Sequence, residues 1–139
     1  MKRMNKTELF SIDAAGRWLI LSWMLAAGAA LAQSATEIDV TAAAHLIQEK
    51  QVFVLDVREP SEYAQGHIAG SVLIPLGQVN ARFAELLQQR DQAMLVVCGS
   101  GVRSAAAIRM LSKQGFSRMQ NIKGGMDAWR KANLPTVQP

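Results

Sequence analysis

The stretch VVCGSGVRSAAA, residues 96–107, holds the one cysteine of the chain, Cys98. Gly99 and Gly101 follow it and let the backbone curl tightly, with positive φ where needed. A curled run of peptide groups at a helix start directs several N–H groups at one point. Such a nest, together with the helix N-terminus and the Arg103 cation, stabilises a thiolate. The stretch therefore predicts a nucleophilic cysteine with a depressed pKa.

The rest of this loop is predicted to bind an anionic substrate. A guanidinium grips an anion through two parallel hydrogen bonds, which makes Arg103 the expected anion-binding side chain. The alternative is that Cys98 is a small buried residue ending a core strand, with glycines that only turn the chain. The expected substrate-binding residues are Gly99, Ser100, Gly101, Val102 and Arg103.

Asp56 and Arg58 end another predicted strand and are expected at the same edge of the sheet as Cys98. Two interpretations of Arg58 are open. In the first, Arg58 steers an anionic substrate toward the site. In the second, it forms an ion pair with Glu59, Glu62 or Asp56 that holds the loop in place. The ion pair is the favoured interpretation, and both Asp56 and Arg58 are supporting candidates for the site.

Strand-like and helix-like stretches alternate along the chain after the first 34 residues. This alternation predicts an α/β fold, one domain with a central parallel five-stranded sheet and helices on both faces. In such sheets ligands bind at the carboxyl ends of the strands, where Cys98 is expected. The predicted strands are 37–40, 52–57, 71–75, 93–98 and 116–122, and the predicted helices are 42–50, 60–63, 78–90, 102–115 and 126–133. In helix 78–90, the apolar face is formed by Val79, Phe83, Leu86 and Leu87.

The first 32 residues are typical of a secretory signal peptide. Four basic residues within positions 1–17 precede the uncharged stretch 18–32, which ends in Ala30-Leu31-Ala32, an A-x-A cleavage pattern. As a helix that stretch would rise about 22 Å, short of the roughly 30 Å hydrocarbon core. We therefore expect a cleaved signal over 1–32 and one domain over 33–139. An uncleaved anchor, which would keep the protein at a membrane, is the alternative.

Composition excludes several classes of partner. The formal charge is +4, but the basic residues outside the N-terminal stretch are scattered and form no run, so nucleic acid is not predicted. A single cysteine forms no internal disulfide. The sequence offers no cluster of ligands for a metal, and no cofactor is expected.

Three stretches resemble the signatures of the rhodanese (sulfurtransferase) domain, and the likeness covers residues 36–133. They are DVREPSEYAQGHIAGSVLIPL (56–76), CGSGVRSAAAIRMLSKQGF (98–116) and NIKGGMDAW (121–129). The single-domain, exported form is most similar to the small periplasmic rhodaneses of bacteria, of the phage-shock type. The predicted signal peptide therefore implies a periplasmic location, and an uncleaved signal would give an anchored domain that faces the periplasm.

The resemblance also implies a reaction. Cys98 attacks the outer sulfur of a small anionic donor such as thiosulfate and becomes a persulfide, and the sulfur passes to a thiophilic acceptor such as cyanide or a thiol. The Cys-x4-Arg spacing of Cys98 and Arg103 resembles the sulfur-transferring branch, whereas related phosphatases have Cys-x5-Arg. The rival functions are a non-enzymatic sulfur carrier that serves a protein acceptor, and a redox module. The redox module is disfavoured because the chain has no resolving cysteine.

Four further residues are interpreted from the resemblance. Ser104 resembles the serine that follows the family's arginine and is expected to support the loop by capping. Gly99 stands where many family loops have a basic or bulky residue, so a side chain that could contact donor or acceptor is missing. The resemblance places His67 in a structural turn. Trp129 is expected to pack in the core under the last helix.

Overall fold

A computed structural model describes residues 35–139, which fold around a five-stranded parallel sheet. The strands are β1 (Glu37–Ile38), β2 (Phe53–Asp56), β3 (Val72–Leu73), β4 (Met94–Val97) and β5 (Met119–Ile122). Their order is β1-β5-β4-β2-β3, and every pairing is parallel. The predicted α/β fold class is confirmed. The signal predicted over 1–32 lies outside the described residues.

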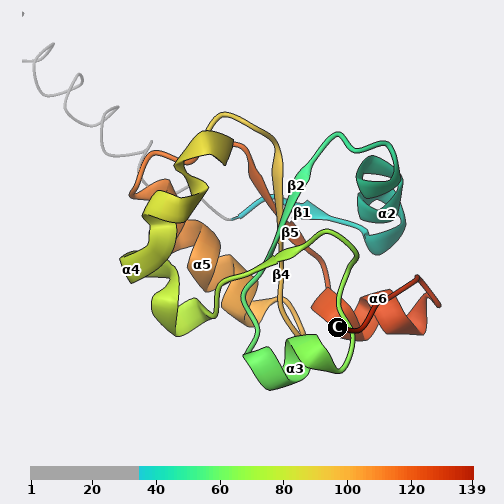
Figure 1. Ribbon diagram of the computed structural model, residues 1–139. Coiled ribbons are helices and arrows are strands. Elements are labelled where there is room, and N and C mark those ends of the chain that lie inside the picture. The colour runs from blue at the N-terminus through green and yellow to red at the C-terminus, as the bar shows by residue number, and fades with distance from the viewer. Residues whose placement is uncertain (1–34) are drawn as a thin grey trace, which may run out of the picture. The chain divides into compact units, whose positions relative to one another are not determined.

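Helices cover both faces of the sheet (Figure 1). The α-helices are α2 (Val40–Gln48), α3 (Pro60–Ala64), α4 (Val79–Arg82), α5 (Val102–Ser112) and α6 (Gly125–Lys131), and the 3-10 helices are η2 (Leu76–Gln78) and η3 (Phe83–Gln89). Helices α4 and α5 lie on one side of the sheet, and α2 and α6 lie on the other. Within residues 35–139, no helix has the length and apolar character needed to cross a membrane.

Each face of the sheet has its own apolar core, because successive side chains of a strand point to opposite faces. Leu55 and Val96 contribute to the core that also holds Leu111 of α5. Val54 and Leu95, their neighbours in the strands, contribute to the other core with residues of α2 and α6. Strands β2 and β4 are therefore buried on both sides, as their continuous apolar sequences predict.

The prediction of one helix over 78–90 is wrong in detail. The chain forms η2, then a single turn of α4, and then the 3-10 helix η3. A 3-10 helix brings residues three apart into line, so Phe83 and Leu86 both face the core while Leu87 falls off that face. Leu87, predicted on the apolar side, is 46% exposed.

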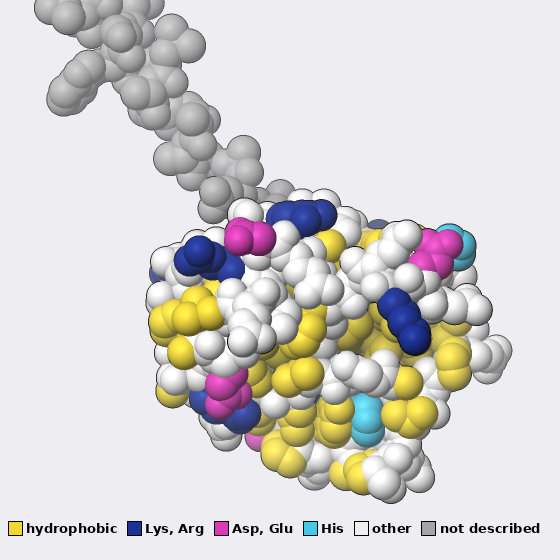
Figure 2. Space-filling view, turned by 45° about the horizontal axis from the view of Figure 1, so that its top comes forward, with side chains coloured by type: hydrophobic (Ala, Val, Ile, Leu, Met, Phe, Trp, Pro, Cys, Tyr) yellow, Lys and Arg dark blue, Asp and Glu magenta, His cyan; other side chains and the backbone are white. Residues whose placement is uncertain are grey.

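Trp129 and His67 bind the C-terminal segment to the rest of the domain through hydrogen bonds. Trp129 is 2% exposed, as predicted for a core residue, and its Nε1–H donates to the Pro135 carbonyl at 3.0 Å. His67 exchanges two backbone hydrogen bonds with Val137, at 3.0 and 2.9 Å. An apolar groove opens beside this segment, lined by residues that include Ile47 of α2. Figure 2 shows apolar side chains gathered on the surface between the two histidines.

The start of α6 packs directly against the backbone that follows β4. The N–H groups of Met126 and Asp127 donate to the carbonyls of Cys98 and Gly99, at 2.8 and 3.0 Å. This approach requires glycine at position 125, whose φ is +57°. A Cβ there would lie 2.4 Å from the Cys98 carbonyl oxygen. The last helix thus holds the loop that carries the cysteine.

We predict that Gly125→Ala destabilises the domain by about 2–5 kcal/mol, because it adds a backbone clash to the penalty of a positive φ. The free energy of unfolding, measured in urea, tests this. Gly70→Ala is the matched control, since Gly70 has a φ of +77° but no atom within 4 Å of the added Cβ. It should lose only about 1–2 kcal/mol. Equal losses in the two variants would contradict the close contact.

Candidate active site

Cys98 lies at the point where β4 turns into the loop that leads to α5. It directly follows Val97, the last residue of the strand, and Gly101 takes a φ of +103° immediately before α5 begins at Val102. The Gly101 N–H donates to Cys98 Sγ at 3.0 Å. The cysteine is 0% exposed, so its sulfur lies at the base of the loop. The loop therefore forms the curled structure that the two glycines predicted.

Ser104 connects the thiol to the neighbouring strand. Its hydroxyl lies 3.4 Å from Cys98 Sγ, 3.1 Å from the Gly101 carbonyl oxygen and 2.6 Å from Asn121 Oδ1. A hydroxyl has one proton, so it donates to one of these acceptors at a time. Asn121 Nδ2 donates to the same Gly101 carbonyl at 2.9 Å. Ser104 and Asn121 together hold the end of the loop.

The pKa of Cys98 results from two opposing effects. Burial of the thiol raises the pKa, because a charge is less stable away from water. Hydrogen bonds from the Ser104 hydroxyl and from the N–H groups of Ser104, Gly101 and Ser100 lower it. The hydrogen bonds prevail, and the pKa of Cys98 lies below its ordinary value of 9.0. The thiolate is thus stabilised chiefly by uncharged donors of the loop and of α5.

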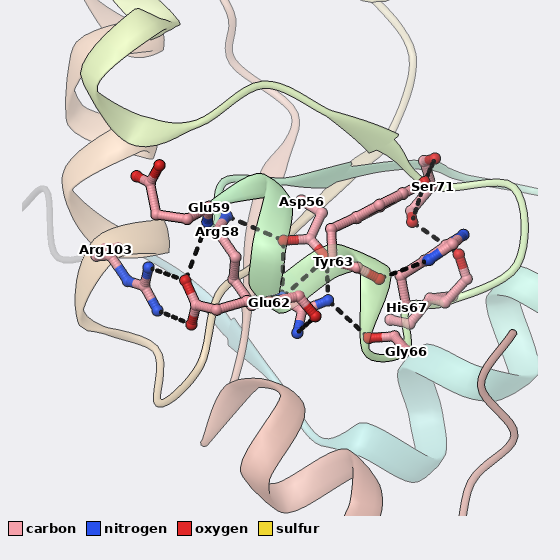
Figure 3. A network of polar contacts seen from close by, with 10 residues as sticks. Asp56, Arg58, Glu59, Glu62, Tyr63, Gly66, His67, Ser71 and Arg103 are labelled. Atoms are coloured by element: carbon pink, nitrogen blue, oxygen red, sulfur yellow. Dashed lines mark hydrogen bonds and ion pairs between the residues drawn. The ribbon is translucent and has the colours of Figure 1, made fainter. Parts of the chain in front are cut away.

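Arg103 is bound to a carboxylate of the same chain (Figure 3). Its Nη1 and Nη2 donate to Oε2 and Oε1 of Glu62, at 2.7 and 2.8 Å, in a two-pronged contact. Glu62 belongs to α3, and about a third of each side chain is exposed. The hydrogen bonds from Arg103 lower the pKa of Glu62 to about 2, and Glu62 raises that of Arg103.

The other residues predicted to bind substrate differ in their exposure. Gly99 and Gly101 are half-buried, and Ser100 is exposed. Val102, at the first position of α5, is 74% exposed. A Cβ on Gly99 would lie 3.1 Å from Arg103 Nη2, so the absence of a side chain leaves room for the Arg103 guanidinium beside the loop.

Asp56, the last residue of β2, and Arg58, which precedes α3, form a buried ion pair. Arg58 is 1% exposed, and its Nε and Nη2 donate to the Asp56 carboxylate at 2.8–3.1 Å. The same guanidinium donates to the carbonyls of Glu62 and Gly66, at 3.2 and 2.9 Å (Figure 3). The ion-pair interpretation of Arg58 is confirmed, with Asp56 as the partner. The pair connects the end of β2 to the middle of α3, at Glu62, and to Gly66 beyond the end of that helix.

Three residues of this site are not among those that the sequence predicts. Asn121 is a buried polar side chain inside β5, but Gln120 precedes it in the same strand, so a polar residue at this position is no signal by itself. Glu62 is predicted only as one of three alternative partners of Arg58. Gly125 directly precedes the predicted helix 126–133, and only the structure shows that its contact with Cys98 requires the absence of a side chain. In residues 35–139, no group of three His, Cys, Asp or Glu side chains is placed to hold a metal ion.

Comparisons with known proteins identify the family of the domain. The family model of the rhodanese-like domain matches residues 39–132. The thiosulfate sulfurtransferase GlpE of Vibrio cholerae is 33% identical over 100 residues, which is 70% of this chain and 91% of that protein. The putative sulfur carrier protein YrkF of Bacillus subtilis is 42% identical over 81 residues, 58% of this chain and 43% of YrkF.

A solved structure shows the same fold. The crystal structure of a rhodanese-related protein from Thermoplasma volcanium superposes with a TM-score of 0.69 at 35% identity, covering 75% of this chain and 99% of that one. The matched region contains the Cys98 loop, its supports in β5 and α6, and the ion pairs around α3. The chain belongs to the rhodanese-like domain family.

Proposed function

We propose that this protein is a sulfurtransferase of the rhodanese type, which moves sulfane sulfur through a persulfide on Cys98. The observation that carries the proposal is the Gly101 N–H, 3.0 Å from Cys98 Sγ in a loop whose donors lower the thiol pKa. The names of relatives, which include a thiosulfate sulfurtransferase and a putative sulfur carrier protein, support sulfur transfer in the broad sense.

In the first half-reaction the Cys98 thiolate attacks the outer sulfur of thiosulfate. A sulfur–sulfur bond forms at Cys98 as the bond between outer and central sulfur breaks, and sulfite leaves with the electron pair. The terminal sulfur of the persulfide then carries the negative charge, which the N–H groups around the loop stabilise. Since Cys98 has no exposed surface, the donor reaches Sγ only when the side chain or residues 99–103 move.

In the second half-reaction a thiophilic acceptor removes the outer sulfur. Cyanide attacks that sulfur, thiocyanate forms, and the Cys98 thiolate leaves with the electron pair. A thiol acceptor takes the sulfur in the same way and becomes a persulfide. The enzyme alternates between a free and a loaded form, so ping-pong kinetics are expected.

A sulfur carrier is the second candidate function. It is favoured by the 42% identity to YrkF, a protein named as a putative sulfur carrier. A carrier would load Cys98 in the same way but would release sulfur only to a protein acceptor. Turnover of thiosulfate with cyanide or a small thiol separates the two functions.

We predict that thiosulfate adds one sulfur atom to the protein, about 32 Da, and that cyanide removes it. Intact mass spectrometry measures both steps. Cys98→Ala should gain no mass, because it lacks the attacking thiolate. A mass gain in Cys98→Ala, or a wild-type thiol that alkylates readily but takes no sulfur from thiosulfate, would contradict the proposed reaction.

We predict that Ser104→Ala raises the pKa of the Cys98 thiol by about one unit, since a hydrogen bond to a charged group is worth roughly 1.5 kcal/mol. The pH dependence of alkylation measures this pKa. Reactivity rises with pH as the thiolate forms, so the midpoint of the curve should move to higher pH. Ser112→Ala removes an exposed hydroxyl from the other end of α5 and should leave the midpoint in place. An unchanged midpoint in Ser104→Ala would exclude its hydroxyl as a donor to the thiolate.

We also propose export to the periplasm, supported by the basic residues ahead of the uncharged stretch 18–32 and by the Ala30-Leu31-Ala32 pattern. The predicted N-terminus of the mature protein is Gln33, and N-terminal sequencing of protein from the periplasmic fraction checks it. Ala32→Asp should block cleavage and retain the longer chain. Met1 retained on wild-type protein in the membrane fraction would identify an anchor, and Met1 retained on soluble cytoplasmic protein would refute export.

A further inference from the structure

Arg103 and Glu62 form a charge-neutral pair beside the thiol loop. Both terminal nitrogens of Arg103 are engaged by Glu62, at 2.7 and 2.8 Å. Because the pKa of Glu62 is about 2, the carboxylate is charged at any pH at which the protein would work. The positive charge that the loop would offer an anion is thus already compensated within the chain.

Glu62 is held in place independently of Arg103. Its Oε2 accepts the Glu59 N–H at 3.0 Å in the capping box of α3. Its own carbonyl accepts from Nη1 of the buried Arg58 at 3.2 Å. The carboxylate is therefore a fixed acceptor, and Arg103 adapts to it. Gly99 permits this arrangement, because any side chain there would begin 3.1 Å from Arg103 Nη2.

The charged groups near the loop have a net negative charge, which repels a dianion. Glu59 and the thiolate of Cys98 both act on Arg103 electrostatically, in addition to Glu62. Arg58 is already paired with Asp56, so it offers little net charge. Lys123 and Asp127, on either side of Gly124 and Gly125, carry opposite charges. A donor with two negative charges therefore meets a region of net negative charge.

We propose that Glu62 determines donor specificity: by neutralising Arg103, it makes the Cys98 loop select sulfur donors that carry at most one negative charge. This inference rests on the proposed function and names the class of donor. Glu62 acts through Arg103 and is a positioning residue. Thiosulfate, a dianion, would then be a poorer donor than a singly charged compound with the same sulfane sulfur.

Two donors of matched shape test the inference. Thiosulfate carries two charges, and methanethiosulfonate carries one because a methyl group replaces a charged oxygen. Each delivers its outer sulfur to Cys98, with sulfite or methanesulfinate as the leaving group. The second-order rate constant of persulfide formation is measured for both donors, either from the increase in intact mass or from the release of sulfite or methanesulfinate.

We predict that Glu62→Gln raises the loading rate roughly tenfold with thiosulfate and about threefold with methanethiosulfonate. The removed repulsion scales with donor charge, so the ratio of the two rates changes by about a factor of three. Glu85→Gln is the control: it removes the same charge from an exposed Arg82–Glu85 ion pair, joined at 3.0 Å, and should leave both rates unchanged. In Glu62→Gln/Arg103→Gln the pair is again neutral, and the ratio should return to the wild-type value.

A structural effect gives a different result. If Glu62 only orders the loop, Glu62→Gln slows both donors by the same factor and leaves their rate ratio at the wild-type value, which overturns the inference. Salt gives a second test on the wild-type protein, because it screens exposed charges. Raising the salt should increase the thiosulfate rate relative to the methanethiosulfonate rate, and a constant or falling ratio would overturn the inference.

The proposed function fails in a distinguishable way. If neither donor loads sulfur onto the wild-type protein, the persulfide chemistry is wrong, and the inference falls with it. If both donors load and the rate ratio is the same in wild-type protein and Glu62→Gln, only the inference is wrong. Circular dichroism and thermal unfolding establish that each variant is folded before the rates are compared.

Discussion

The contact between the start of α6 and the carbonyls of Cys98 and Gly99 determines the geometry of the thiol loop. The N–H groups of Met126 and Asp127 bind these carbonyls at 2.8 and 3.0 Å. A planar trans peptide points its N–H opposite to its carbonyl, so carbonyls fixed toward α6 turn the following N–H groups away from it. The Ser100 N–H belongs to the same peptide group as the Gly99 carbonyl, and it is among the donors that lower the thiol pKa. A backbone contact thus orients the groups that stabilise the thiolate.

The two arginine–carboxylate pairs differ in burial and therefore in role. Arg58 and Asp56 are buried, and removing one partner of such a pair typically costs about 3–5 kcal/mol, because a charge is left without compensation. Arg58 also binds the carbonyls of Glu62 and Gly66, which fixes α3. Arg103 and Glu62 are part-exposed, where an ion pair adds little to stability. The buried pair supports the fold, and the exposed pair sets the charge at the loop.

The parts of this structure that depend on local patterns were predictable. Continuous apolar runs indicate β2 and β4, and the glycines around Cys98 indicate a tight loop at the end of β4. The sequence did not show that η3 is a 3-10 helix, because apolar residues spaced three or four apart fit both a 3-10 helix and an α-helix. Only the structure shows that Leu87 lies outside the core. Nor could the sequence show Asn121 beside Ser104, since residues 17 apart in the chain meet only once the sheet has formed.

Arg103 shows why a residue type and its spacing predict a site better than they predict its charge. The Cys-x4-Arg spacing places a cation beside the thiol, and a free guanidinium there would bind an anion. Whether it is free depends on Glu62, which is 41 residues away in sequence and is held by the fold of α3. A guanidinium that already has a carboxylate at 2.7 Å must give up or share that partner before it binds another anion. The affinity of the loop for an anion therefore depends on the difference in free energy between the contact of Arg103 with the anion and its contact with Glu62. The tertiary structure sets the second of these contacts.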